Sequence, residues 1–234
     1  MDRILQGEED WQASVASALS SARRPIVRSG RFAPRDAAGR TNLQRYDRAS
    51  FPPARAASTL LLLYPGVDGD LTIPLTVRHA ELRAHAGEIS LPGGAVDPGD
   101  VTPADAALRE AWEELGVERA SVRILGELDP VWIPVSNFEL RPFVGAATAR
   151  PDFRPHDAEV SAVVELPLHL IVSEEIVADE EIDARGLVLR TAVYRYAGHR
   201  IWGATAITLA MFAAVLVEAG VGGDAVADRA ASDP

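Results

Sequence analysis

LPGGAVDPGDVTPADAALREAWEELGV, residues 91–117, joins a glycine turn to a short segment that carries a cluster of acids. Pro103 suits the first turn of a helix, and Gly116 suits the position just after a helix ends. The sequence therefore predicts a helix over residues 103–115, with the acids in its last turns.

Three glutamates are expected to crowd one face of this helix. At about 100° per residue, Glu114 lies about 40° from Glu110, and Glu113 lies about 60° to the other side. A solvated acidic face is the simplest alternative. Like charges at i,i+4 and acids at a helix C-terminus both destabilise, however, and Arg109 offsets only one acid. A divalent cation such as Mg²⁺, which binds carboxylate oxygens and retains waters or substrate phosphates, would offset the others.

These residues resemble the Nudix box, in which a Gly-Gly turn and an acid precede the pattern R-E-U-x-E-E-x-G-U, where U is aliphatic. Residues 109–117 match every defined position. The first half departs, since Asp100 replaces the usual Glu and one extra residue separates the glycines from Arg109. The resemblance implies an α+β fold, the Nudix-type α/β/α sandwich with a mixed β-sheet.

Residues 74–94 resemble the signature of the coenzyme A pyrophosphatase branch, L-L-T-x-R-(S/A)-x3-R-x3-G-x3-F-P-G-G. The spacing holds, while Pro74, His79 and Leu91 depart from it. The resemblance implies a hydrolase that converts coenzyme A or its thioesters to 3′,5′-ADP and a 4′-phosphopantetheine product. Two alternatives stay open: a Nudix hydrolase of another nucleoside diphosphate derivative (ADP-ribose, a dinucleotide or a nucleoside triphosphate), and a ligand-binding module without turnover.

The resemblance also implies residue roles. The cofactor is expected to be Mg²⁺ or Mn²⁺, with the metal ligands Glu110, Glu113, Glu114 and Gly94. The expected catalytic residues are Glu113, Glu114, Arg109, which orients Glu113, and Glu159, for which a surface acid is the alternative. The expected substrate contacts are Gly93, Arg78 and Arg83, with a salt bridge inside the loop as the alternative for the two arginines.

Composition bounds the class of protein. The chain has 234 residues, 47% of them hydrophobic, which predicts one globular unit with extra arms. We expect an N-terminal helix and basic arm in residues 1–50, the Nudix domain in residues 51–219, and a disordered tail in residues 220–234. The lack of cysteine excludes disulfides and thiolate metal sites.

Charge and hydropathy predict the partners. A net charge of −11 disfavours nucleic-acid binding, so the expected partner is a small-molecule substrate, with a homodimer as one option for the assembly. Residues 201–217 are apolar but short and interrupted, which favours a buried helix over a membrane span. The acids near the N-terminus argue against a signal peptide, and we expect a cytoplasmic protein.

Periodicity predicts the remaining elements. We expect an amphipathic helix over residues 9–22 with Asp10 as its cap, and a closing helix over residues 204–217. Strands are expected over residues 57–64, 71–78, 122–128, 138–148, 159–166 and 187–196. Pro74 predicts an edge or bulge in the second strand, and the last strand is expected to be an exposed edge. The arm from Arg23 to Arg48 holds eight arginines, which predicts a segment that clasps the acidic body or else contacts phosphate.

Overall fold

The computed structural model describes residues 7, 10–26, 30–79, 88–184 and 186–221. Arg83 and residues 222–234, which make up most of the expected tail, lie outside this part of the chain. The proposed boundaries at residues 50 and 219 stay predictions.

The chain forms five helices and eleven strands within the described residues. The helices are α1 (Trp11–Ser21), α2 (Asn42–Arg45), α3 (Pro103–Leu115), α4 (Leu168–Ser173) and α5 (Gly203–Glu218). The first eight strands are β1 (Arg55–Pro65), β2 (Leu71–Arg78), β3 (Ile89–Ser90), β4 (Gly93–Ala95), β5 (Arg123–Glu127), β6 (Val131–Ile133), β7 (Phe138–Ala146) and β8 (Val160–Pro167). The last three are β9 (Val177–Ala184), β10 (Leu187–Tyr196) and β11 (His199–Ile201).

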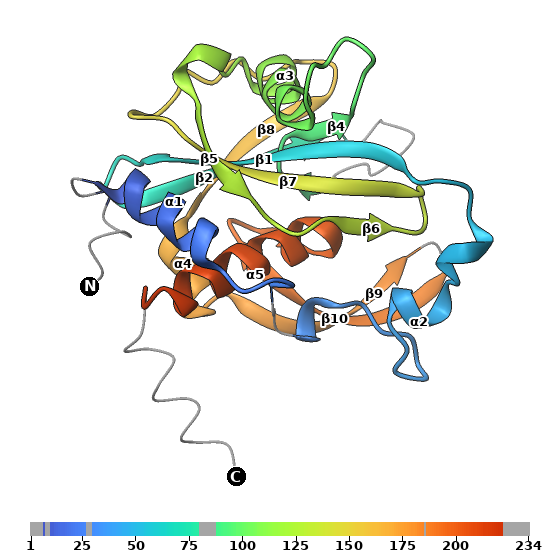
Figure 1. Cartoon of the computed structure of the whole chain (residues 1–234). Coiled ribbons are helices and arrows are strands. Elements are labelled where there is room, and N and C mark those ends of the chain that lie inside the picture. The colour runs from blue at the N-terminus through green and yellow to red at the C-terminus, as the bar shows by residue number, and fades with distance from the viewer. Residues whose placement is uncertain (1–6, 8–9, 27–29, 80–87, 185, 222–234) are drawn as a thin grey trace.

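The first eight strands make one mixed sheet. Its main order is β3-β2-β1-β7-β5, with β4 paired to β1, β6 to β7 and β8 to β2. Strands β1 and β7 run parallel, whereas the other pairs are antiparallel. Helix α3 covers one face, and α1 and α5 lie on the other, with the β9–β10–β11 sheet beyond α5 (Figure 1). The predicted α+β sandwich with a mixed sheet is confirmed.

Strand β1 is buried on both faces. Leu60, Leu62 and Tyr64 pack in the core beneath α3. Leu61 and Leu63 point into the opposite core, which contains α5. Burial on both faces explains why this strand reads as a continuous apolar run instead of alternating with polar residues.

Helix α3 has the predicted bounds, because local signals fix both of its ends. Thr102 and Asp105 form a reciprocal capping box at the start, and Pro103 occupies the first turn. Gly116 ends the helix with φ 70°, a left-handed conformation that favours glycine. The acids therefore sit in the last turns, as the sequence predicts.

Three local predictions need correction. Strand β10 is an edge for only part of its length: β9 pairs on one side, and on the other β11 pairs with residues 194–196 and Arg35 bridges Arg190. Asp10 is not a side-chain cap of α1: its φ is 72° and only its backbone carbonyl accepts, from Ser14 N–H. Strand β9, with the sequence VADEEIDA, was not expected, since its frequent acids mask the strand pattern.

Strand β2 is also an interior strand. It pairs with β8 along its length, while on its other side the ladder to β1 stops at Thr72 and the ladder to β3 starts at Thr76. Pro74 lies in the gap between these two ladders, where its missing N–H breaks no strand pairing. The register shift falls later, between Val77 and Arg78.

The closing helix α5 is a core helix. Leu209, Met211 and Phe212 are fully buried between the two sheets. Within the described ranges, no helix combines the length and the apolar character needed to cross a bilayer.

The basic arm clasps the body, as one of the two alternatives for it predicts. Arg24 pairs with Asp129 at 2.6 Å, and Arg31 pairs with Asp179 of β9 at 2.9 Å. Phe32 stacks on Tyr194 of β10 with 4.7 Å between ring centroids. The arm is therefore attached by both charge and apolar packing.

Candidate active site

Helix α3 sorts its three glutamates by depth. The helix buries Ala107, Ala111 and Leu115 against β1. This orientation buries Glu114, which is only 5% exposed, and leaves the Glu113 side chain 46% exposed. The Glu110 side chain is 16% exposed. The three acids therefore share a helix but not a single environment.

The Gly93–Gly94 strand lies close to β1 and to these acids. A Cβ on Gly94 would lie 2.4 Å from Glu110 Oε1, and one on Gly93 would lie 2.5 Å from the carbonyl oxygen of Ser58. Gly93 N–H donates to Glu114 Oε2 at 3.3 Å. Gly93 is required here, because its Cβ would clash with the backbone of β1, whereas at Gly94 the close atoms are the end of the flexible Glu110 side chain. The strand places main-chain groups beside the carboxylates.

Arg109 joins the helix to the turn that precedes it. Its Nη1 donates to Glu110 Oε1 at 2.7 Å and to Glu113 Oε2 at 3.0 Å. Its Nε and Nη2 bind the two oxygens of Asp100, each at 3.1 Å, and Nη2 also donates to the carbonyl of Ala95 at 2.9 Å. The guanidinium lowers the pKa of Asp100 below its ordinary value. The expected contact of Arg109 with Glu113 is present, and Asp100, the departure from the family pattern, serves as the anchor of this arginine.

Glu114 is the least neutralised of the acids. Its pKa is raised to about 8, mainly by burial and in smaller part by the charges of Glu110 and Glu159. The Gly93 N–H and the Arg78 guanidinium, whose Nη1 lies 3.8 Å from Glu114 Oε1, oppose this rise. A buried carboxylate with so few donors is costly to ionise, and a cation nearby would remove that cost.

We expect the metal-depleted protein to lose stability as pH rises. The folded-state pKa of Glu114, about 8, lies above its ordinary value of 4.5, so the unfolded chain releases this proton first. Stability is complete below about pH 4.5 and falls by a few kcal/mol, on the order of 1.4 per pKa unit, up to about pH 8. Urea unfolding in EDTA between pH 5 and 8.5 measures this slope, and the Glu114→Gln variant should lack it. An equal slope in both proteins would contradict the assignment.

A distant loop brings Glu159 to the acids. His156 N–H donates to the carbonyl of Glu114 at 2.9 Å, and Arg154 N–H donates to that of Leu115 at 2.8 Å, so this loop caps the end of α3. Glu159 follows the loop, and its carbonyl accepts from His79 N–H at 3.1 Å. Its charge is close enough to act on Glu114. No local pattern in the sequence indicates this cap.

The structure brings most of the expected site residues together. It places Arg78, Gly93, Gly94, Arg109, Glu110, Glu113, Glu114 and Glu159 around one end of α3. Arg83 lies outside the described residues. Arg78 faces Glu114, and its buried Nε has no hydrogen-bond partner among the described residues.

The donor set suits a hard divalent cation. Mg²⁺ and Mn²⁺ prefer carboxylate and carbonyl oxygens, and Glu110, Glu113, Glu114 and the Gly94 backbone offer these. In the described part of the chain, no three His, Asp or Glu side chains already converge as a metal-binding group. Arg109 holds Glu110 and Glu113, so a cation would compete with this guanidinium for them. The buried charge on Glu114 favours such an exchange.

Comparison with known proteins identifies the family of the chain. Nudix hydrolase 22, chloroplastic, of Arabidopsis thaliana is 36% identical over 176 residues, or 72% of this chain and 57% of that protein. The match therefore spans less than two thirds of the plant protein. A Yersinia pestis (strain Pestoides F) protein named Uncharacterized Nudix hydrolase NudL is 37% identical over 135 residues, or 58% of this chain and 67% of that protein.

The solved structures and the family model extend the comparison. The crystal structure of a Nudix hydrolase from M. smegmatis, RenU, has a TM-score of 0.41 and 21% identity over 59% of this chain and 80% of that one, and overlap at this level adds nothing to the assignment. A family model described as the NUDIX domain matches residues 56–186, which include every described residue of the site. Because this match covers more than half of the chain, the protein belongs to the Nudix family.

Proposed function

We propose that this protein hydrolyses the diphosphate bond of a nucleoside diphosphate derivative with the help of a divalent metal ion. The observation that carries the proposal is the buried, under-neutralised Glu114 next to Glu110 and the Gly93–Gly94 turn. A bound Mg²⁺ or Mn²⁺ would neutralise charge on the phosphate oxygens and lower the pKa of the attacking water. Glu110, Glu113, Glu114 and the Gly94 backbone would hold it.

The residues of the chain supply the rest of the reaction. Water attacks one phosphorus, the bond from that phosphorus to the bridging oxygen breaks, and two phosphate monoesters leave. Glu159 is the proposed base that accepts the proton of the water, because it is the remaining acid within electrostatic reach of Glu114. Arg78 is the proposed phosphate ligand, since its Nε has no partner within the described residues and its Nη1 lies 3.8 Å from Glu114 Oε1.

Arg109 has a positioning role in this proposal. It holds Asp100, Glu110 and Glu113 together and is only 14% exposed, so it is saturated with contacts inside the protein. A guanidinium used in this way keeps the carboxylates in place through the reaction and leaves phosphate binding to Arg78.

The proposed substrate within this class is coenzyme A or one of its thioesters. Support comes from residues 74–94, whose spacing resembles the coenzyme A pyrophosphatase signature, and from Arg78 of that segment, which lies beside Glu114. Pro74, His79 and Leu91 depart from the signature. These departures favour, as the second candidate, another diphosphate such as ADP-ribose or a dinucleotide.

A panel of diphosphates tests the proposal. We expect the purified full chain with Mg²⁺ or Mn²⁺ to convert coenzyme A to 3′,5′-ADP and 4′-phosphopantetheine, with a kcat/KM at least about tenfold above that for ADP-ribose, dinucleotides and nucleoside triphosphates. Mass spectrometry identifies the products, and H₂¹⁸O identifies which phosphorus is attacked. Equal or greater turnover of another diphosphate would shift the substrate. Absence of turnover on the whole panel would leave a ligand-binding module as the function.

A further inference from the structure

The hairpin between β10 and β11 borders a cavity of about 360 Å³. Its turn residues, Ala197 and Gly198, have φ of 50° and 79°, as a tight type I′ turn requires at both positions. Such a turn holds the two strands in one register, and Arg195 lies directly opposite Arg200. The cavity therefore has a fixed wall that carries two arginines.

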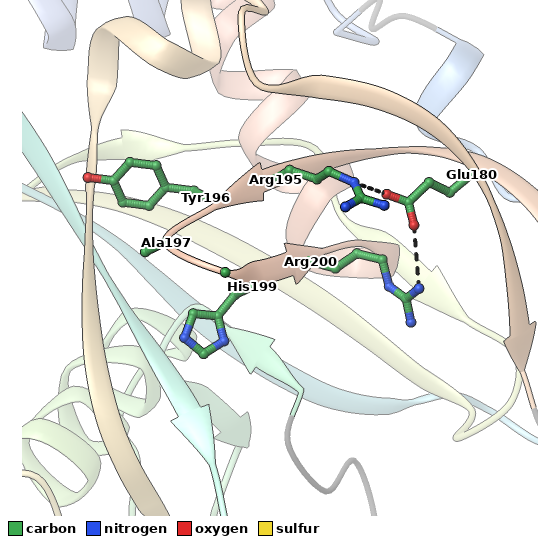
Figure 2. Close-up of a pocket in the computed structure, with 7 residues that line it drawn as sticks. Glu180, Arg195, Tyr196, Ala197, His199 and Arg200 are labelled. Carbon is green, nitrogen blue, oxygen red and sulfur yellow. Dashed lines mark hydrogen bonds and ion pairs between the residues drawn. The ribbon is translucent and has the colours of Figure 1, made fainter.

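A single carboxylate pairs with both of these arginines. Glu180 of β9 binds Arg195 Nε through Oε1, and its Oε2 lies 3.4 Å from Arg200 Nη1 (Figure 2). The Glu180 side chain is only 12% exposed, whereas those of Arg195 and Arg200 are 65% and 49% exposed. The two guanidiniums and the one carboxylate together carry one net positive charge, which faces the cavity and the solvent.

The other described residues that line the cavity add no acid to balance that charge. Tyr196 and His199 form the next register pair, so their side chains lie on the opposite face of the strands, and Figure 2 shows them pointing away from the arginines. Glu180 is the acid among the described residues that line the cavity. Like charges directly opposite on neighbouring strands destabilise a sheet, and this chain has a net charge of −11 with many other acids available. An anion bound between the guanidiniums would offset their repulsion.

The hairpin is connected to the candidate active site through strand β3. Strand β11 packs against β3, and β3 ends at Ser90, three residues before Gly93. Gly93 in turn donates to Glu114. A substrate held by the acids at its diphosphate could therefore extend toward the hairpin.

We propose that the cavity is a subsite for a phosphate monoester group of the substrate, bound by Arg195 and Arg200. The planar guanidinium fork matches phosphate oxygens, and two arginines on paired strands can bind one phosphate from two sides. Glu180 holds both side chains in place while leaving the site cationic. The choice of substrate rests on the proposed diphosphate hydrolysis, whereas the binding of a phosphate monoester does not.

Calorimetry with two nucleotides tests the subsite without turnover. We expect the full chain to bind adenosine 3′,5′-bisphosphate about tenfold more tightly than adenosine 5′-monophosphate, because only the former carries a second monoester. The Arg195→Gln/Arg200→Gln double variant should bind the two nucleotides equally. Arg190→Gln is the matched control, since Arg190 forms a similar ion pair with Glu181 at the other end of the same strand pair.

A second variant guards against loss of folding. Glu180→Gln removes the carboxylate that competes with phosphate for the two arginines. We therefore expect this variant to bind the bisphosphate and inorganic phosphate several-fold more tightly than the parent does. Misfolding would weaken binding and cannot produce this gain. Glu181→Gln, on the opposite face, should change nothing.

The outcomes separate the subsite from the proposed function. Equal affinity of the wild-type chain for both nucleotides, or a preference that survives in the double variant, would overturn the subsite even if coenzyme A is hydrolysed. A preference that the double variant loses would establish the subsite even if coenzyme A is not turned over.

Discussion

Replacing Glu114 with Gln is expected to lower kcat/KM for the diphosphate substrate by about a thousandfold. Glu114 is the most buried of the three glutamates, and its carboxylate is the charge that a bound cation would neutralise. Losing it would remove about 4 kcal/mol of transition-state stabilisation, at 1.36 kcal/mol for each factor of ten. Steady-state kinetics at saturating Mg²⁺ measure the loss.

The same variant should fold as well as the parent. Gln can still accept from Gly93 N–H, and it removes the desolvation cost of a buried charge, so the metal-depleted variant should be at least as stable at pH 8. Glu118→Gln is the matched control, because Glu118 is an exposed acid four residues further along with no side-chain capping bond. Retained turnover in Glu114→Gln would remove the metal-assisted reading of the acid cluster.

Replacing Arg109 with Ala is expected to lower the free energy of unfolding by about 2–4 kcal/mol. The arginine is 14% exposed and binds Asp100, Glu110, Glu113 and the Ala95 carbonyl. Its removal leaves three carboxylates in proximity without a counter-charge. Urea unfolding at pH 7 measures the change.

The stability lost in Arg109→Ala should depend on pH in a definite direction. Arg109 lowers the folded-state pKa of Asp100, so the stability that this pair provides is present above about pH 4 and is lost as pH falls through the folded pKa. The difference between wild type and Arg109→Ala should therefore shrink in acid. Arg119→Ala, an exposed arginine near the same acid, should change stability by no more than about 0.5 kcal/mol. A similar loss in both variants would show that general charge, and not this network, holds the turn to α3.

Local signals carried the prediction of α3. Pro103 and Gly116 fix its ends through backbone conformation, which depends on residues within one turn, and the predicted bounds are those observed. The spacing of the glutamates along the helix followed from the same geometry. The different burial of the three glutamates did not follow from local geometry. Glu114 is buried because β1 lies beneath it and because a loop caps its carbonyl, and both are distant in the sequence.

The second sheet was only partly predictable. The pattern of β10 is clear from alternation, but an edge strand and a central strand can alternate alike, since alternation reports the faces of a strand and not its neighbours. The acids of β9 obscure its strand pattern in the sequence. They form ion pairs with Arg31, Arg195 and Arg200. Because these acids pair with residues far away in the chain, their positions do not follow the period of a strand.

The sequence by itself determined the acid-bearing helix, the glycine turn, the mixed α+β class and the resemblance to the Nudix family, because capping, periodicity and motif spacing are encoded within short stretches. Tertiary structure decided which glutamate is buried, that Asp100 anchors Arg109, that Glu159 reaches Glu114, and that Arg195 and Arg200 share one carboxylate. Electrostatic environment depends on distances between residues far apart in the chain, and only the packed fold sets those distances.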